Sequence, residues 1–150
     1  MRKRTLAREY ALQILYQVEM NPGKLSEIIE NFWSHQGQPA KEVQEFAEVL
    51  VKGTLQNQQE IDKVISNAAE NWELGRMAVV DKNIMRAATY ELLYLEDVPQ
   101  KVSINEAVNM AKKFSQEDSG KFVNGILDKI NHSEKPRYQV STNESDASPV

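Results

Sequence analysis

Apolar residues recur along most of the chain at the three- and four-residue spacing of an amphipathic helix, and no stretch keeps the alternation of a strand. Five helices are predicted before residue 100: Thr5 to Met20, Leu25 to His35, Val43 to Leu55, Ile61 to Trp72 and Val80 to Leu95. Asn21-Pro22-Gly23 ends the first helix. The polar run 56–60 separates the third helix from the fourth, and the pattern is compatible with two helices or with one kinked rod.

The stretch from Val102 to Ile130 predicts two more short helices around a polar turn, 115–121. Ser103 and Glu106 have the spacing of a capping box, and Val102 and Ala107 that of a hydrophobic staple. The second of these helices has an apolar stripe of Phe122, Val123, Ile126, Leu127 and Ile130. The whole pattern predicts an all-α fold of six or seven helices.

Glu91 falls at the border of the apolar face of the fifth helix, seven residues after Ile84. We expect it to be an edge residue whose carboxylate reaches water. A buried position is the alternative, and it would require a partner such as an arginine, because an unpaired buried charge is costly.

At 150 residues the chain is long enough for one domain with a real core, which we place at 1–131. Residues 132–150 are rich in Ser, Asn, Pro and charge, and they are expected to form a disordered tail. There is no cysteine, which excludes disulfides and thiolate metal sites. No apolar run approaches the roughly 20 residues of a membrane span, so a soluble cytoplasmic protein is expected.

Charge is distributed unevenly along a chain whose net charge is −4. Arg2, Lys3, Arg4 and Arg8 precede the first acid, Glu9. Positive charge at a helix N-terminus opposes the helix dipole, so helix stability does not account for it. The cluster is either a solvated basic end or an arm that binds phosphates.

The polar turn holds a second group of candidates, since Asp118, Lys121 and Phe122 lie together at the start of the last helix. Phe122 is of the right type either to fill the core or to stack on a base. Asn105 and Asn124 lie among apolar residues and are expected to hydrogen-bond backbone between helices.

The sequence shows no pattern typical of catalysis. The two histidines, His35 and His132, lie far apart and outside any metal-spaced cluster. Gly120 and Gly125 lack the Lys-Ser/Thr that completes a phosphate-binding loop, and no nucleophile elbow is present. We therefore expect no enzyme activity, no catalytic residue, no cofactor and no metal.

Several motifs, in order along residues 4–130, resemble the NusB family of bacterial transcription antitermination factors. In the first half they are Arg8-Glu9-x-Ala11-x-Gln13-x-Leu15-Tyr16 and Arg86-Ala87-Ala88-x-Tyr90-Glu91-Leu92. In the second half they are Val98-Pro99-x-Lys101-Val102-x-Ile104-Asn105-Glu106-Ala107, Ala111-Lys112-x-Phe114 and Lys121-Phe122-Val123-Asn124-Gly125-x-Leu127-Asp128. Each motif is weak alone, but the ordered set is specific.

The resemblance implies two three-helix bundles packed across each other. It also implies binding of boxA RNA together with NusE, a small-subunit ribosomal protein, within an RNA polymerase antitermination complex that contains other Nus factors and transcribes ribosomal RNA operons. It is compatible with a monomer or a homodimer.

The resemblance also assigns roles to individual residues. It implies RNA contacts by Arg2, Lys3, Arg4 and Arg8 in the arm, and by Asp118, Lys121 and Phe122 at the turn. It implies that Tyr16 and Asp81 lie on the partner-binding side. Arginine suits such an arm because it pairs with phosphates and stacks on bases.

Two other functions remain open from the sequence. One is a helical module that binds only protein. The other is a detached RNA-binding domain, because similar helical domains precede the catalytic domain of some ribosomal RNA cytosine methyltransferases. The chain carries no such catalytic domain after Ile130.

Overall fold

A computed structural model describes residues 2–70 and 72–138 of the chain. In this part the chain is all-α, as predicted, with seven α-helices and a short 3₁₀ helix, η1. The elements are α1 (Lys3–Met20), α2 (Leu25–His35), α3 (Lys41–Gln56), α4 (Gln58–Ala68), η1 (Leu74–Arg76), α5 (Val79–Tyr94), α6 (Gln100–Phe114) and α7 (Ser119–Ser133). None of these helices is long and apolar enough to cross a membrane.

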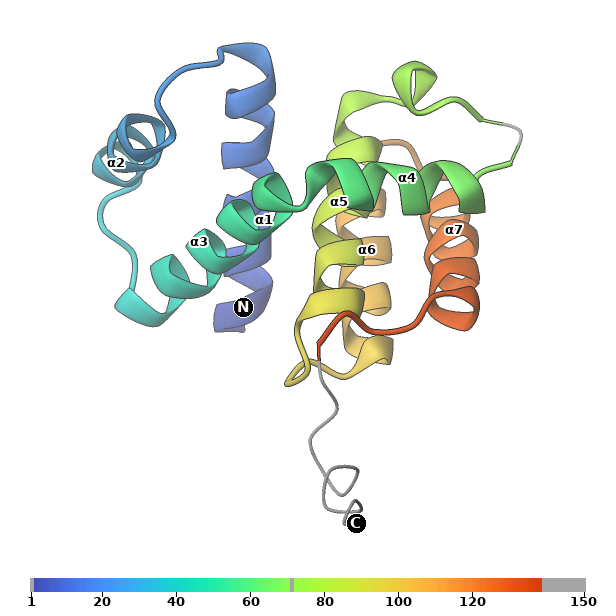
Figure 1. The fold of residues 1–150 in the computed structure, drawn as a ribbon. Helices are drawn as coiled ribbons and strands as arrows, with labels where there is room; N and C mark the ends of the chain where they lie inside the picture. The colour runs from blue at the N-terminus through green and yellow to red at the C-terminus, as the bar shows by residue number, and fades with distance from the viewer. Residues whose placement is uncertain (1, 71, 139–150) are drawn as a thin grey trace.

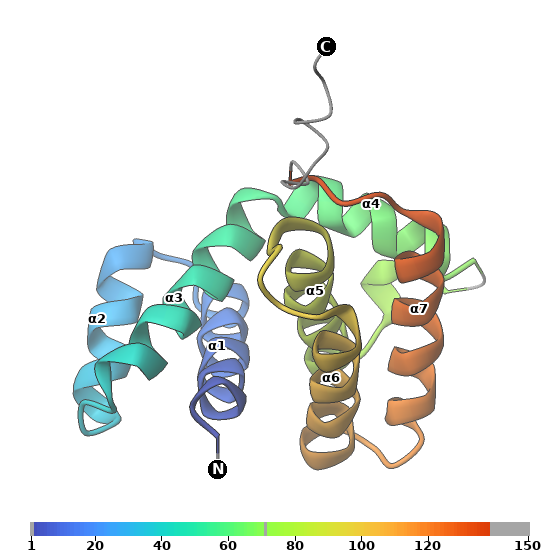
Figure 2. The ribbon, with the colours of Figure 1, turned by 90° about the horizontal axis from the view of Figure 1, so that it is seen from below.

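The helices form two groups, with α1 to α3 on one side and α4 to α7 on the other (Figures 1 and 2). Each group surrounds its own apolar cluster. The clusters also share elements, because Ala87 and Val98 from the second half belong to the first cluster and Leu12 of α1 belongs to the second. The second bundle has one helix more than the resemblance implied, because α3 and α4 are separate.

Asn57 is the joint between α3 and α4. Its side-chain amide donates a hydrogen bond to the carbonyl of Gly53 at 2.8 Å, which satisfies a carbonyl near the end of α3. Residues 41–68 therefore form two separate helices and not one kinked rod, and the chain bends between them (Figure 1).

A buried ion pair joins the two bundles. Arg8 donates from Nε to Glu91 Oε2 and from Nη2 to Glu91 Oε1, both at 2.8 Å. The two side chains are only 4% and 3% exposed. The expectation that Glu91 reaches water is wrong, and its arginine partner comes from α1, 83 residues away along the chain. Burial alone would lower the pKa of Arg8, but the hydrogen bond and charge of Glu91 raise it overall, so the guanidinium stays charged.

The capping box at Ser103 is also a wrong prediction. Helix α6 begins three residues earlier, at Gln100, directly after Pro99, whose φ of −60° suits the position before a helix. Ser103 is therefore inside the helix, and its hydroxyl donates to Glu91 Oε1 at 2.7 Å. Glu106 lies 3.6 Å from Arg8 Nη1. Both residues support the buried ion pair instead of a helix start.

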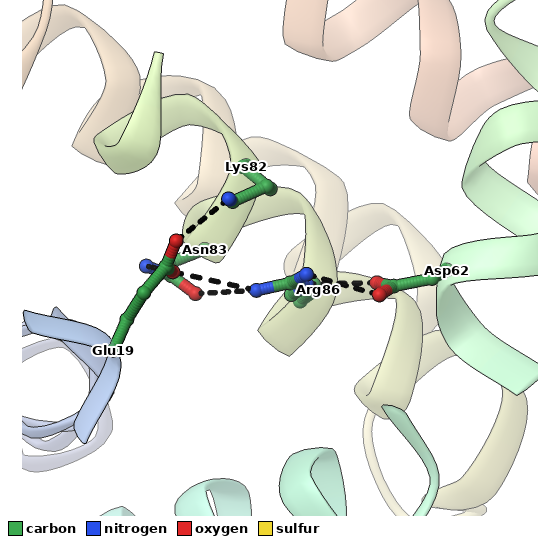
Figure 3. Close-up of polar contacts among 5 residues, drawn as sticks. All are labelled: Glu19, Asp62, Lys82, Asn83 and Arg86. Carbon is green, nitrogen blue, oxygen red and sulfur yellow. Dashed lines mark hydrogen bonds and ion pairs between the residues drawn. The ribbon is translucent and has the colours of Figure 1, made fainter. Parts of the chain in front are cut away.

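A second polar network ties the other end of α1 to α4 and α5 (Figure 3). Glu19 accepts hydrogen bonds from Lys82 at 2.7 Å and from Asn83 at 3.2 Å, and it lies 3.5 Å from Arg86. Arg86 also donates from Nε and Nη2 to the two carboxylate oxygens of Asp62, at 2.7 and 2.9 Å. Helix α1 is thus held against α5 at two levels.

Residues 132–138 of the predicted tail lie within the described part of the chain. Helix α7 continues to Ser133, and the backbone N–H of Arg137 donates to the carbonyl of Leu93 at 2.6 Å. The Arg137 guanidinium also bonds Glu60 at 2.5 Å. Arg137 therefore holds this segment against α5 through its backbone N–H and against α4 through its side chain. The rest of the predicted tail, 139–150, lies outside the described residues.

Gly53 lies where α3 crosses α5, and a Cβ built there would come within 2.0 Å of Tyr90 Cζ. We expect Gly53→Ala to lower the free energy of unfolding by about 1–3 kcal/mol, because the ring must move in a packed site. Gly125→Ala is the matched control, since no atom of the described residues outside its own helix turn lies within 4 Å of that position. That control is expected to gain up to about 1 kcal/mol from helix propensity. Urea denaturation tests both, and equal effects would contradict the crowded crossing.

The network around Glu19 predicts a pH dependence. Burial alone would raise the pKa of Glu19, but the hydrogen bonds from Lys82 and Asn83 and the charges of Lys82 and Arg86 lower it overall. The pKa of Glu19 is therefore lower in the folded chain than in the unfolded chain, where it is about 4.3. Such a carboxylate stabilises the fold at pH values above the unfolded pKa. This stabilisation is lost as the pH falls through the folded pKa.

Glu19→Gln is therefore expected to be less stable than the wild-type chain at pH 7, and the difference should shrink as the pH falls below the unfolded pKa of about 4.3 and through the folded one. Denaturation curves from pH 7 to pH 3 measure this difference. Glu30→Gln, at an exposed acid of α2, is the control and should show no such convergence. A stability gap for Glu19→Gln that is the same at pH 3 and pH 7 would contradict the assignment.

Candidate functional site

The basic end of α1 is exposed. Arg2 is the residue before the helix, and the first turn contains no acid. Lys3 lies 3.2 Å from Glu42, and Arg4 lies 3.4 Å from Asp97, with all four side chains largely in solvent. Exposed ion pairs of this kind are worth roughly 0–1 kcal/mol, so a phosphate can replace the carboxylates.

Arg4 has a second contact, because its guanidinium lies 4.1 Å from the centre of the Phe46 ring. A cation over an aromatic face is held in place without losing its hydrogen-bond donors. Arg4 is therefore oriented but still able to pair with an anion.

Arg8 does not belong to this exposed group, although the sequence suggested it. Its Nε and Nη2 are committed to Glu91, and its Nη1 faces Glu106. Because the side chain is buried, a phosphate could reach it only by breaking the link between the bundles. The structure thus gives Arg8 a supporting position, and the arm consists of Arg2, Lys3 and Arg4.

An apolar hollow of about 450 Å³ lies between α1, the start of α5 and the end of α6. Tyr16 and Phe114 are its most exposed aromatic residues, at 45% and 38%. Val80 and Leu12 also line it. Beside it, Lys113 of α6 bonds Glu9 of α1 at 3.0 Å. Exposed aromatic residues around a hollow are typical of a surface that binds another protein.

Asp81 does not share this surface with Tyr16. It is buried, and its Oδ2 accepts a hydrogen bond from Ser119 at 3.1 Å. It lines a second hollow, of about 290 Å³, together with Asp118 and Phe122. The structure therefore brings Asp81 to the two turn residues, and the two predicted partner-side residues lie in different hollows.

The turn between α6 and α7 places the remaining candidates. Asp118 directly precedes α7, and its side chain makes no capping hydrogen bond. Phe122 is partly buried and packs edge-to-face on Trp72, with ring centroids 5.3 Å apart. Lys121 is exposed and does not line the hollow.

Trp72 was missed as a candidate because its spacing fits the apolar stripe of the fourth helix. Helix α4 ends earlier, at Ala68, and Trp72 is 57% exposed. The helix-breaking loop around Gly75 was the only sequence signal that the residue lies outside the core.

The arm and the turn lie on the same side of the molecule but not next to each other. Figure 2 shows the N-terminus and the α6–α7 turn along its lower edge, whereas Figure 1 places the turn well above the N-terminal end of α1. The hollow at Tyr16 is formed by α1, α5 and α6, which also carry the arm and lead into the turn.

The described residues contain no group of three potential metal ligands. His35 and His132 are exposed, and each contacts a carbonyl of its own helix at 2.8 Å.

Comparison with known proteins gives a consistent result. The sequence model of the NusB family matches residues 5–132. Two proteins named transcription antitermination protein NusB are similar over 85% of this chain: one from Geobacter sulfurreducens, 47% identical over 92% of its length, and one from Thermodesulfovibrio yellowstonii, 44% identical over 91%. That name describes regulation of transcription, in agreement with the prediction that the chain is not an enzyme.

Solved structures agree with this result. Thermotoga maritima NusB matches with a TM-score of 0.80 at 38% identity, over 91% of this chain and 95% of that one. A crystal structure of the antitermination factors NusB and NusE in complex with dsRNA matches with a TM-score of 0.80 at 28% identity, over 88% of this chain and 98% of that one.

The different positions of Arg4 and Arg8 predict different effects of their removal. Arg8→Ala leaves the Glu91 carboxylate buried without its cation, so we expect the free energy of unfolding to fall by about 3–5 kcal/mol. Arg4→Ala should cost under about 1 kcal/mol. Arg8→Met with Glu91→Leu removes both charges and should recover part of the loss. Urea denaturation compares the three variants, and a small loss for Arg8→Ala would contradict the structural role.

Proposed function

The chain belongs to the NusB family, and we propose that it is a transcription antitermination factor that binds boxA RNA together with NusE. The observation that carries the proposal is its similarity, over 88% of its length, to a structure that contains NusB, NusE and dsRNA. The exposed cations at the start of α1 supply the charge that an RNA backbone requires.

In this proposal the RNA contacts two places. Arg2, Lys3 and Arg4 pair with phosphates, while Asp118, Lys121 and Phe122 contact nucleotides at the α6–α7 turn. Both places lie on one side of the molecule (Figure 2). A single strand suits them better than a duplex, because its bases are free to stack and to present their edges. Arg8 does not contact the RNA in this proposal; its pair with Glu91 holds α1, which carries the arm, in place.

NusE is proposed to bind the apolar hollow that contains Tyr16. Its exposed aromatic rings and apolar lining offer buried area that a soluble partner would cover. Asp81, the second residue predicted on the partner side, lines the neighbouring hollow at the α6–α7 turn and is not part of this surface. We further propose that the RNA-bound pair joins RNA polymerase and other Nus factors in the cytoplasm.

A gel-shift titration with boxA RNA, with and without NusE, tests this function. We expect a shifted complex that is tighter when NusE is present. The salt dependence tests the arm: Lys3→Ala with Arg4→Ala should weaken binding and reduce the slope of log K against log salt by about 1.4, near 0.7 for each lost phosphate contact with a single strand.

Lys24→Ala with Lys135→Ala is the matched control, because it removes the same charge from exposed positions outside the proposed surface. It should leave the slope unchanged. An equal effect of the two double variants would show general charge attraction, and no shift with or without NusE would favour a module that binds only protein.

A further inference from the structure

Asp81, which lines the hollow beside the α6–α7 turn, has a buried oxygen whose hydrogen-bonding capacity is unused. Asp81 Oδ2 accepts from Ser119, and the Ser119 hydroxyl also lies 3.0 Å from that of Ser115. Asp81 Oδ1 is buried and has no hydrogen-bond partner within the described part of the chain. Asp81 as a whole residue is 8% exposed. A buried acceptor without a donor is costly, so a ligand that donates a hydrogen bond there would gain from it.

An aromatic pair stands beside this carboxylate. Trp72 and Phe122 line the same hollow, with their rings edge-to-face and Trp72 more than half exposed. The indole of Trp72 also has exposed surface outside its contact with Phe122, and a flat ring can stack there. Arg76 also lines the hollow, and its guanidinium lies 3.6 Å from the exposed carboxylate of Glu73.

We propose that this hollow, formed by Trp72, Phe122, Asp81 and Arg76, binds one unpaired RNA base that carries an amino group. The base stacks on Trp72, its amino group donates to Asp81 Oδ1, and Arg76 pairs with the adjoining phosphate. The inference rests on the proposed RNA-binding function and adds a nucleotide site to it, with Trp72, Asp81 and Arg76 as further contact residues.

The dimensions and charges support a base over other ligands. A hollow of about 290 Å³ is at the small end for ligand sites, which suits a single nucleotide better than a peptide segment. A carboxylate accepts hydrogen bonds and repels carbonyl oxygens. Guanine, adenine and cytosine each offer an amino group, whereas uracil presents two carbonyl oxygens around one N–H.

The position of Asp81 in α5 favours the negatively charged form of its side chain. It is the third residue of α5, where the positive end of the helix dipole favours an anion. Because Oδ1 is itself shielded from solvent, a base must displace a neighbouring side chain to reach it, so binding should be detectable as a local rearrangement.

The experiment is an NMR titration of the full chain with mononucleotides, which separates the hollow from the arm. The indole N–H of Trp72 is the reporter, and Trp33→Phe identifies it, because the chain has two tryptophans. The probes are GMP, AMP, CMP, UMP and ribose 5-phosphate. We expect GMP, AMP and CMP to shift the Trp72 signal and to bind at least about five-fold more tightly than UMP or ribose 5-phosphate.

Two variants check the roles of the residues. Trp72→Leu should weaken all four nucleotides about ten-fold, since stacking is worth roughly 1–3 kcal/mol per base, while Trp72→Phe should retain most of the affinity. Asp81→Asn keeps the shape but presents a donor, so it should remove the preference over UMP. Circular dichroism and urea denaturation confirm that each variant is folded.

The result that overturns the inference is a Trp72 signal that no nucleotide shifts, or one that ribose 5-phosphate shifts as strongly as GMP. Unchanged boxA affinity in Trp72→Leu would likewise overturn it, while the proposed function would stand. Loss of the proposed function appears separately, as an absent gel shift for the wild-type chain with NusE.

Discussion

The ion pair between Arg8 and Glu91 is the constraint on which the arrangement of the two bundles depends. Two charges out of contact with water must face each other closely, and here two parallel hydrogen bonds of 2.8 Å fix both the distance and the rotation of α1 against α5. Ser103 and Glu106 extend the constraint to α6. An apolar contact at this point would allow α1 to slide or turn, whereas the bidentate pair allows one register.

This register determines what α1 exposes. With Arg8 turned inward, Arg4 lies one helical turn earlier and remains at the surface, beside Phe46. At the other end, the network from Glu19 to Asp62 prevents α1 from swinging away from α4 and α5 (Figure 3). The basic end, the hollow at Tyr16 and the α6–α7 turn are therefore held in one geometry by polar contacts made elsewhere.

The sequence predicted the helices well because their apolar spacing is local information. It failed where a residue's environment is set by a distant partner. From the sequence, Arg8 was predicted to be an exposed cation and Glu91 an acid at the edge of the apolar face. The residues next to each of them in the sequence do not show that the two side chains form a pair. Ser103 has the spacing of a capping box, but the helix begins earlier, directly after Pro99, so Ser103 is inside it. Trp72 fitted a helical stripe beyond the point where the helix ends. The turn residues Asp118 and Phe122 were identified, but their meeting with Asp81 depends on tertiary packing.

The sharing of core residues between the bundles bears on how the protein is made. Ala87 and Val98 complete the apolar cluster of the first three helices, and Glu91 neutralises the charge of Arg8. During synthesis the N-terminal bundle therefore emerges from the ribosome without part of its core and with an arginine that has no counter-ion. It can reach its final packing only after α5 has emerged and the chain has extended to about residue 98. The two halves are thus one cooperative unit, completed late in translation, although each surrounds its own cluster.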